Sequence, residues 1–311
     1  MLGLTALLAQ TEPSGFVVWV DRIARAPLSK VVLFAAFFTF VRLAVWPTLK
    51  NTPTYERLGA YNFAKVVNEI CDAIVYAGVV VFMLVRPFGI QTFFIPSGSM
   101  IDTLLLYDYI VANKWVYRVA EPKHNDIVVF KPPKGALNEG QGDTDFIKRL
   151  IGTPGDIVEW KGKRLYRNGK PIDEPYVDYT VPLSPSGPVL PVSSWKDVNQ
   201  ADFKLVFDNG RYIPVQYTGT FVNRIATVEN PTGEDISNTG CADEFVPKDA
   251  AEALRWRNLP PAPIPPGYYF FMGDNRNGSF DSRGWGLVPR DSIIGKSEFI
   301  WFPFNRWRKT D

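Results

Sequence analysis

Two serines, separated by one glycine, lie in an apolar stretch, and each is a candidate nucleophile. The stretch is FFIPSGSMIDTL, residues 93–104, and it contains Ser97 and Ser99. A serine hydroxyl must lose its proton before it attacks a carbonyl, so it needs a base such as a histidine, a carboxylate or a neutral lysine. The chemistry within reach of such residues is acyl transfer. The first question is which group takes the proton.

Histidine is an improbable base in this chain. The single histidine, His124, lies in the polar turn EPKHNDIVVF, where a solvated side chain is the ordinary case. A zinc site would need several histidine or cysteine ligands close together, but the only two cysteines, Cys71 and Cys241, are far apart in the sequence. We therefore expect no metal, no cofactor and no disulfide framework, and a base other than histidine.

A lysine in a strand-like run is the more interesting candidate. The run is DFIKRLIG, and a period of two places Lys148 on the same face as Phe146 and Leu150. Burial on an apolar face disfavours the ammonium form and lowers the pKa of a lysine. Strand lysines more often extend their amines into water. Periodicity alone therefore leaves both roles open for Lys148.

Three blocks of sequence occur in the order of a known enzyme family. They are IPSGSM at residues 95–100, KRLIGTPGD at 148–156 and GDNRNGSFDSRGWGLVP at 273–289. Together they resemble the type I signal peptidases, which are membrane-bound serine-lysine endopeptidases that cut leader sequences from exported proteins. The resemblance implies a mainly β catalytic domain of the signal-peptidase and LexA-like fold, preceded by N-terminal transmembrane helices.

The resemblance implies a role for each serine and for the lysine. Ser99 matches the nucleophile and Lys148 the general base. Ser97 matches the serine whose hydroxyl joins the Ser99 backbone N–H in holding the oxyanion, a contribution that typically amounts to about a hundredfold or more in rate.

The last block carries the supporting residues that the resemblance implies. Ser279 matches a serine that hydrogen-bonds the lysine amine, while Asp281 and Arg283 match a nearby ion pair. The plainer interpretation of GDNRNGSFDSR is a turn rich in Gly and Asx that satisfies its own backbone. Both interpretations hold together if the turn is what keeps Ser279 in place.

Three positions depart from the family pattern. Asp102 replaces a proline within a PTL run, and Asn125 and Tyr107 stand where the family commonly has glycine. These are turn or packing positions, so the departures put local geometry in question more than catalysis.

The N-terminal third has the composition of a membrane anchor. An apolar run at about residues 30–47 is interrupted only by Arg42, and a second run at about 70–88 contains Arg86 near its end. Both arginines are expected toward segment ends, where a long side chain reaches the headgroups. Residues 1–92 are therefore expected to hold a tail and two transmembrane segments. A pair of buried core helices is the alternative, because each run is shorter than the ~20 residues of a clean span.

From residue 93 onward the sequence changes to short β-branched and aromatic runs separated by Gly, Pro and Asp. This sequence pattern predicts strands and hairpins, with RNGK at residues 167–170 as a hairpin turn. A region at about 181–266 is rich in Pro and Ser at both ends, which indicates an inserted lobe. We expect residues 93–311 to form a β-rich peptidase domain that carries this lobe.

The expected function is cleavage of signal peptides from exported preproteins after an A-x-A-like site. Its expected partners are signal-peptide-bearing preproteins and membrane lipid, and the chain is expected to be a monomer. The net charge of +2 gives no reason to expect nucleic-acid binding. The expected location is the bacterial cytoplasmic membrane, with several spans and an extracytoplasmic catalytic domain. A LexA-type self-cleaving protein and an inactive membrane-tethered β module are the open alternatives.

Overall fold

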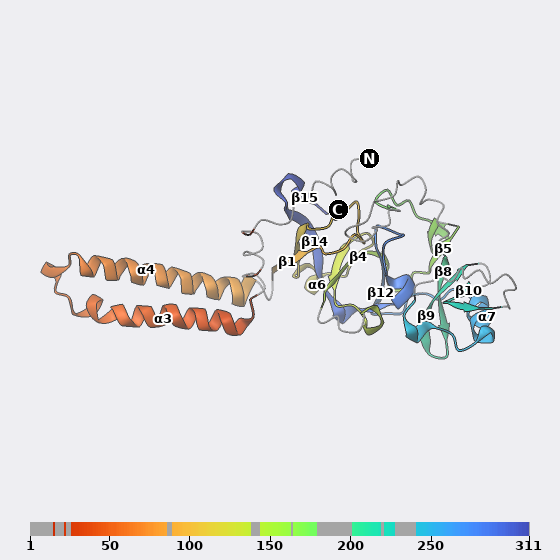
Figure 1. The fold of residues 1–311 in the computed structure, drawn as a ribbon, viewed down its shortest axis with the longest axis horizontal. Coiled ribbons are helices and arrows are strands. Elements are labelled where there is room, and N and C mark those ends of the chain that lie inside the picture. Colours follow the sequence, from red (N-terminus) through yellow and green to blue (C-terminus); the bar gives the residue numbers. More distant parts are fainter. Residues whose placement is uncertain are drawn as a thin grey trace. The chain divides into compact units, whose positions relative to one another are not determined.

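The computed structural model describes nine parts of the chain: residues 15, 22, 26–85, 89–137, 144–162, 164–178, 201–218, 221–227 and 241–310. The chain divides into two compact units (Figure 1). One is helical and contains Pro13–Thr92 with Asn113–Trp115, and the other is rich in β-strands and contains Phe93–Ala112 and Val116–Asp311.

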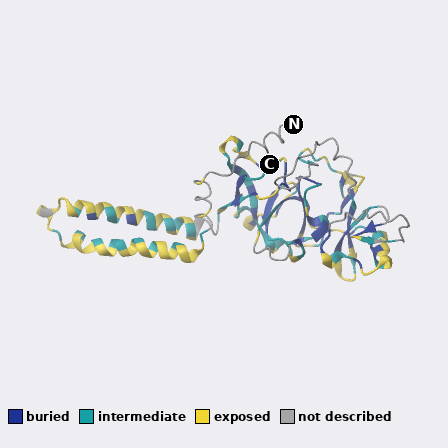
Figure 2. Ribbon diagram, viewed as in Figure 1, coloured by how far each residue is buried: buried dark blue, intermediate teal, exposed yellow. Residues whose placement is uncertain are grey.

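Two long helices make up the helical unit. α3 spans Leu28–Asn51, and α4 spans Ala60–Val79 and continues as the π-helix η2 over Val80–Val85. A short 3-10 helix, η1 (Thr54–Glu56), lies between them. Two segments of 24 residues, Leu28–Asn51 and Ala60–Met83, are apolar and long enough to cross a membrane. Most of their residues are exposed (Figure 2), which argues against the alternative of buried core helices.

Arg42 does not lie near a segment end, as the sequence led us to expect. α3 continues to Asn51, so the guanidinium lies well inside the helix. It forms an ion pair with Asp72 of α4, with 2.5 Å between Nη1 and Oδ1, and its Nε donates to Asn68 Oδ1 at 3.4 Å. A charge in an apolar span is stabilised by a partner of opposite sign, and here the partner is on the neighbouring helix. Arg86 lies outside the described residues.

The first sheet of the β-rich unit has eight strands. Its order is β1 (Ile90–Phe94), β2 (Tyr109–Asn113), β14 (Ile293–Phe302), β3 (Ile127–Phe130), β4 (Phe146–Gly152), β12 (Tyr268–Met272) and β13 (Val288–Pro289), with β15 (Arg308–Lys309) paired to β14. β4 runs antiparallel to both β3 and β12. β4 is therefore held on both edges by hydrogen-bonded neighbours. Buried apolar residues of these central strands form two clusters, and the strands are coloured as buried in Figure 2.

The second sheet has seven strands and includes part of the inserted region. Its order is β11 (Ile225–Ala226), β10 (Phe221–Val222), β9 (Arg211–Thr218), β8 (Asp202–Asp208), β5 (Val158–Lys161), β6 (Arg164–Arg167) and β7 (Lys170–Pro171). The predicted RNGK turn joins β6 to β7, with Asn168 and Gly169 at φ of 54° and 74°, as a type I′ turn requires. Because β8 pairs with β5, the described part of the insert extends an existing sheet.

Short helices complete the β-rich unit. They are α6 (Val116–Val119), α7 (Ala250–Asn258) and α8 (Ser282–Trp285), with 3-10 turns η3 (Lys134–Ala136), η5 (Asp243–Phe245), η6 (Arg290–Ser292) and η7 (Phe304–Arg306). α8 matters most for the site, because its N-cap residue is Asp281, which accepts a hydrogen bond from the backbone N–H of Arg283.

Candidate active site

The loop that carries the two serines is anchored on both sides of Ser99. Ile95 donates from its backbone N–H to the Asp108 carbonyl, and Leu104 donates to the Met100 carbonyl at 2.8 Å. The side chains of Met100 and Leu104 are buried in the cluster beneath the first sheet. Ser99 itself is 8% exposed, whereas Ser97 is exposed. Core packing next to the serine therefore fixes its hydroxyl in a buried position.

Lys148 lies in the middle of β4 and points its amine at Ser99. Its Nζ lies 2.7 Å from Ser99 Oγ and 3.2 Å from the Ile147 carbonyl oxygen, and the residue is only 5% exposed. Phe146 and Leu150 pack in one buried cluster and Ile147 in another, as the predicted period of two requires. The amine also lies 5.5 Å from the centre of the Phe146 ring. The apolar face predicted for this lysine is thus confirmed.

Burial lowers the pKa of Lys148 to about 8, because the apolar surroundings disfavour the ammonium form. The carboxylates of Asp281 and Asp274 act in the opposite direction and moderate the shift. A lysine with this pKa is partly neutral near physiological pH, and a neutral amine is able to accept the proton of a neighbouring hydroxyl.

The structure brings Ser97 close to Ser99, whereas it shows no hydrogen bond from Ser279 to Lys148 among the described residues. Ser97 Oγ lies 3.4 Å from Ser99 Oγ. The Ser279 hydroxyl is buried and has no hydrogen-bond partner among the described residues, although it lies close enough to Asp281 to favour the ionised carboxylate. Its expected bond to the amine of Lys148 therefore stays a prediction.

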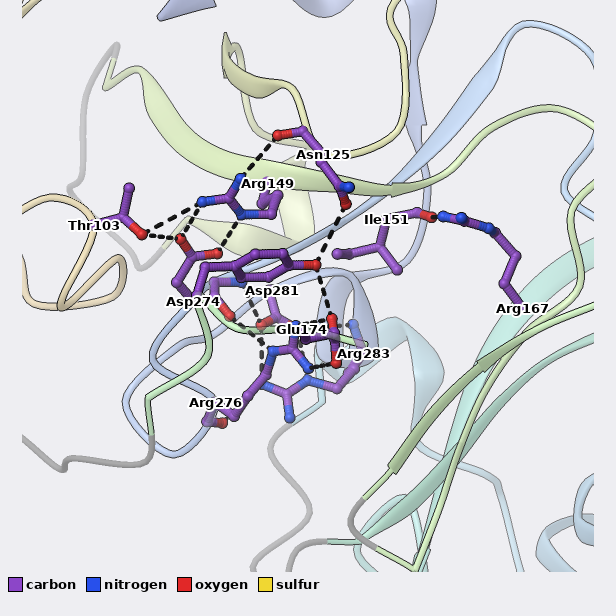
Figure 3. Close-up of polar contacts among 12 residues, drawn as sticks. Thr103, Asn125, Arg149, Ile151, Arg167, Glu174, Asp274, Arg276, Asp281 and Arg283 are labelled. Carbon is purple, nitrogen blue, oxygen red and sulfur yellow. Dashed lines mark hydrogen bonds and ion pairs between the residues drawn. The ribbon is translucent and has the colours of Figure 1, made fainter. Parts of the chain in front are cut away.

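Asp281 and Arg283 form an ion pair beside the site (Figure 3). The distances are 2.8 Å from Arg283 Nε to Asp281 Oδ1 and 2.9 Å from Nη2 to Oδ2. Burial acts to raise the pKa of Asp281, but the Arg283 guanidinium, the Gly273 backbone N–H and the nearby Ser279 hydroxyl together outweigh it, and the pKa is lowered. Asp281 Oδ2 also accepts the backbone N–H of Gly273, so this pair tethers the turn to the end of β12.

Sequence reasoning assigned no role to Asn275, which holds the loop of Ser99 directly. Its backbone N–H donates to the Ser99 carbonyl at 3.1 Å, and its side-chain Nδ2 donates to the Gly98 carbonyl at 3.1 Å. It lies in the block GDNRNGSFDSR, whose composition indicates a turn rich in Gly and Asx. This composition predicts a turn, but no sequence pattern links the turn to Gly98, which lies 177 residues earlier.

A second pair that the sequence did not reveal lies beside the lysine. Arg149 binds Asp274 with both ends of its guanidinium, at 2.8 Å and 2.7 Å, and both side chains are buried (Figure 3). Thr103 adds a hydrogen bond to Asp274 Oδ2 at 2.6 Å. A bidentate contact of this kind fixes geometry as well as charge.

His124 belongs to a different cluster. Its Nε2 lies 2.6 Å from Asp156 Oδ2 and 3.2 Å from Thr153 Oγ1, and its side chain is about one-third exposed. None of the described contacts joins it to Ser99. The expectation that the base is not histidine agrees with this placement.

Comparison with known proteins identifies the family. The family described as signal peptidase, peptidase S26, matches residues 67–302, which is more than half of the chain. The chain belongs to this signal peptidase family. The resemblance drawn from three sequence blocks is therefore confirmed, as is a mainly β fold that follows apolar N-terminal helices.

Several curated relatives of this signal peptidase are similar over most of their length. Signal peptidase I of Aquifex aeolicus is 35% identical over 228 residues, covering 71% of this chain and 78% of the relative. Signal peptidase I of Bacillus licheniformis is 30% identical over 244 residues, which cover 78% of this chain and 92% of the relative. Signal peptidase I of Haemophilus influenzae is 29% identical over 266 residues, which cover 73% of this chain and 67% of the relative.

A crystal structure of a signal peptidase I from Enterococcus faecalis V583 also matches this signal peptidase, with 22% identity and a TM-score of 0.28 over 57% of this chain and 97% of that chain. The family and its relatives establish a membrane-associated serine endopeptidase that acts on signal-peptide-bearing preproteins.

Proposed function

We propose that this signal peptidase cuts its substrates with a dyad of Ser99 and Lys148. The observation that carries the proposal is the 2.7 Å distance between Lys148 Nζ and Ser99 Oγ, both in buried residues. A general base must lie within about 2.6–3.2 Å of the atom whose proton it takes. The lowered pKa of about 8 supports the same role, since it leaves a fraction of the amine neutral.

In acylation the Ser99 hydroxyl proton is transferred, a bond forms between Ser99 Oγ and the substrate, and the peptide C–N bond breaks. The Lys148 amine takes the Ser99 hydroxyl proton as Ser99 Oγ bonds to the scissile carbonyl carbon. The resulting ammonium then gives that proton to the leaving amine, and the peptide C–N bond breaks. The products of this half-reaction are the free mature N-terminus and an ester between the signal peptide and Ser99.

Deacylation uses the same groups with water as the nucleophile. Lys148 takes a proton from water, the hydroxide attacks the ester carbon, and the proton returns to Ser99 Oγ as the C–O bond breaks. In both halves the carbonyl oxygen becomes negative. The Ser99 backbone N–H and the Ser97 hydroxyl, which lies 3.4 Å from Ser99 Oγ, are the donors we assign to it.

The substrate is proposed to be an extended peptide with small residues at the first and third positions before the cut. β1 lies at one end of the order of the first sheet and leads directly to Ser97 and Ser99. An edge strand offers backbone groups to which a peptide adds as a further strand, while alternate side chains enter pockets. This placement supports recognition of an A-x-A-like site.

Cleavage of a purified preprotein by the full-length chain in detergent tests the dyad. Wild type is expected to release the signal peptide, Ser99→Ala to show no turnover, and Ser97→Ala to be slower by about 10²–10³ through the loss of one oxyanion donor. An inactive membrane-tethered module would show no turnover in the wild type either. Turnover by Ser99→Ala would refute the assignment of the nucleophile.

We also propose that the β-rich unit lies outside the cytoplasm and that both long helices cross the membrane. Two apolar helices of 24 residues separated by a short connection support a hairpin whose loop, residues 52–59, is cytoplasmic. The cut site of an exported preprotein emerges on the outer face, so the active site belongs there.

Protease added to intact spheroplasts is therefore expected to digest the β-rich unit and to spare the loop at residues 52–59. Lysed spheroplasts provide the control in which both are accessible. A protected β-rich unit together with a cleaved loop would reverse the orientation.

A further inference from the structure

A short segment after β7 clamps the catalytic turn, although none of the three sequence blocks includes it. We call Glu174–Asp178, with the sequence EPYVD, the strap. Its last residue, Asp178, forms a parallel bridge with Asn275. The Asp178 N–H donates to the Asp274 carbonyl and the Arg276 N–H donates to the Asp178 carbonyl, both at 2.9 Å. The strap therefore lies alongside the turn that holds Ser99.

The first residue of the strap makes a buried ion pair with the same turn (Figure 3). Glu174 accepts from Arg276 at 2.5 Å and 2.8 Å, and the two side chains are 9% and 0% exposed. Arg276 Nε also donates to the Gly273 carbonyl at 3.1 Å. Removing one partner of such a pair leaves an uncompensated buried charge, so Glu174 is what permits Arg276 to remain inside.

The middle of the strap reaches the lysine strand. The ring of Tyr176 lies under the Arg149 guanidinium, with 3.9 Å from Cζ to the ring centre. Its hydroxyl donates to Glu174 Oε1 at 3.0 Å. Arg149 directly follows Lys148 in β4 and binds Asp274 with two hydrogen bonds. A cation on an aromatic face and a bidentate carboxylate together fix the plane of the guanidinium.

We propose that the strap is a positioning element for the dyad, and that Glu174 and Tyr176 set the distance between Ser99 and Lys148. Two routes of contact support this inference, and it rests on the proposed function. One runs from Glu174 through Arg276 to the turn in which Asn275 binds the Ser99 and Gly98 carbonyls. The other runs from Tyr176 through Arg149 to the neighbouring Lys148. None of the described hydrogen bonds and ring contacts of Glu174 and Tyr176 is made to Ser99 Oγ or Lys148 Nζ.

Loosening the strap is expected to lower kcat and to leave KM nearly unchanged. Glu174→Gln removes the charge that compensates Arg276, so the turn relaxes and Ser99 loses its alignment. A displacement of about 1 Å in a reacting group costs up to about 10²-fold in rate, and we expect a fall of about 10- to 100-fold in kcat. The strand proposed to bind the substrate is β1, whose neighbour in the sheet is β2, and none of the strap contacts described above reaches it.

The pH profile provides a readout that a loss of stability alone does not move. Burial is the main cause of the lowered pKa of Lys148, so water that enters a loosened site shifts the midpoint of the kcat profile upward from about 8. The carboxylates that face the amine are Asp274 and Asp281. They stay paired with Arg149 and Arg283 in the variant, so they do not produce the shift themselves.

The chain offers a matched control in the second sheet. Asp208 is 14% exposed and accepts hydrogen bonds from Arg255 Nη2 at 2.6 Å and from Trp256 Nε1 at 3.0 Å. Like Glu174, it is a carboxylate that binds both an arginine and the polar group of an aromatic side chain. Asp208→Asn is expected to lower Tm while kcat and the midpoint of the pH profile stay at the wild-type values.

A second comparison is made at Tyr176. Tyr176→Phe keeps the ring over Arg149 and is therefore expected to lose less kcat than Tyr176→Leu.

The test is steady-state and single-turnover cleavage of a preprotein by each full-length variant in detergent, from pH 6 to 10.5, so that kcat, KM and the rate of the chemical step are all measured, with Tm measured in parallel. The strap is supported if Glu174→Gln loses kcat and shifts its midpoint upward while Asp208→Asn does neither. If Glu174→Gln does not fold, the contrast between Tyr176→Phe and Tyr176→Leu decides. Wild-type kcat in Glu174→Gln or in Tyr176→Leu, or equal losses in Glu174→Gln and Asp208→Asn, would overturn it. Turnover by Ser99→Ala would refute the dyad itself.

Discussion

Replacing Lys148 by arginine is expected to abolish cleavage as completely as replacing it by alanine. A guanidinium keeps its proton at any pH at which the protein is folded, so it supplies charge but no base. Loss of a general base typically costs about 10²–10⁴ in rate, and kcat of both variants is expected to fall by at least that range. The fall in rate is measured by single-turnover cleavage of a preprotein at pH 8.5 by the wild type and both variants.

The histidine provides the control for this result. His124 binds Asp156 and Thr153, and it has no described contact with Ser99. His124→Ala is therefore expected to retain kcat near the wild-type value, with some loss of Tm. Near-wild-type turnover by Lys148→Arg, or loss of turnover in a folded His124→Ala variant, would show that the base has been misassigned.

A single methyl group at Gly273 is expected to disable the enzyme. A Cβ at this position would lie 2.4 Å from the Ser99 carbonyl oxygen and 2.3 Å from Ser279 Oγ. The Ser99 carbonyl is held in place, because it accepts a hydrogen bond from the Asn275 backbone N–H at 3.1 Å. Gly273→Ala therefore displaces the nucleophile, and kcat is expected to fall by about a hundredfold or more.

Gly152 offers a matched comparison in β4. A Cβ there would lie 2.5 Å from Ile264 Cδ1 and 2.7 Å from Val158 Cγ2, which is similar crowding against core side chains. Overpacking typically costs about 1–3 kcal/mol, so both variants are expected to lose Tm. Only Gly273→Ala is expected to lose kcat once both are assayed folded. Equal kcat losses would mean that the Gly273 effect is one of stability.

The residues that we propose carry out the chemistry could be named from the sequence alone. Family blocks pointed to Ser99 and Lys148, and the strand period placed the lysine on an apolar face. The departures were informative as well, because Tyr107 and Asn125 adopt φ of 68° and 70° in the left-handed region. Only glycine enters this region without cost, which explains why glycine is common in the family at these two positions.

Contacts between distant segments could not be read from the sequence. Glu174 and Arg276 are 102 residues apart, and only the fold brings two surface-type residues together inside it. Arg42 was misplaced for a different reason. Its helix continues beyond Pro47 to Asn51, and an apolar count does not show where a helix ends or that Asp72 of the next helix lies opposite.

The pH–rate profile of single-turnover cleavage by the wild-type chain tests the dyad most directly. Below the pKa of Lys148 the amine is an ammonium and is unable to accept the Ser99 proton, and above it the amine is free. The logarithm of the rate is therefore predicted to rise with unit slope at low pH, and the rate is predicted to reach half its maximum near pH 8 and to level off above it. This midpoint is well below the pKa of 10.5 of an ordinary lysine. A rate that stays flat from pH 6 to 10.5 with chemistry rate-limiting, or a midpoint that disappears in His124→Ala, would contradict the dyad.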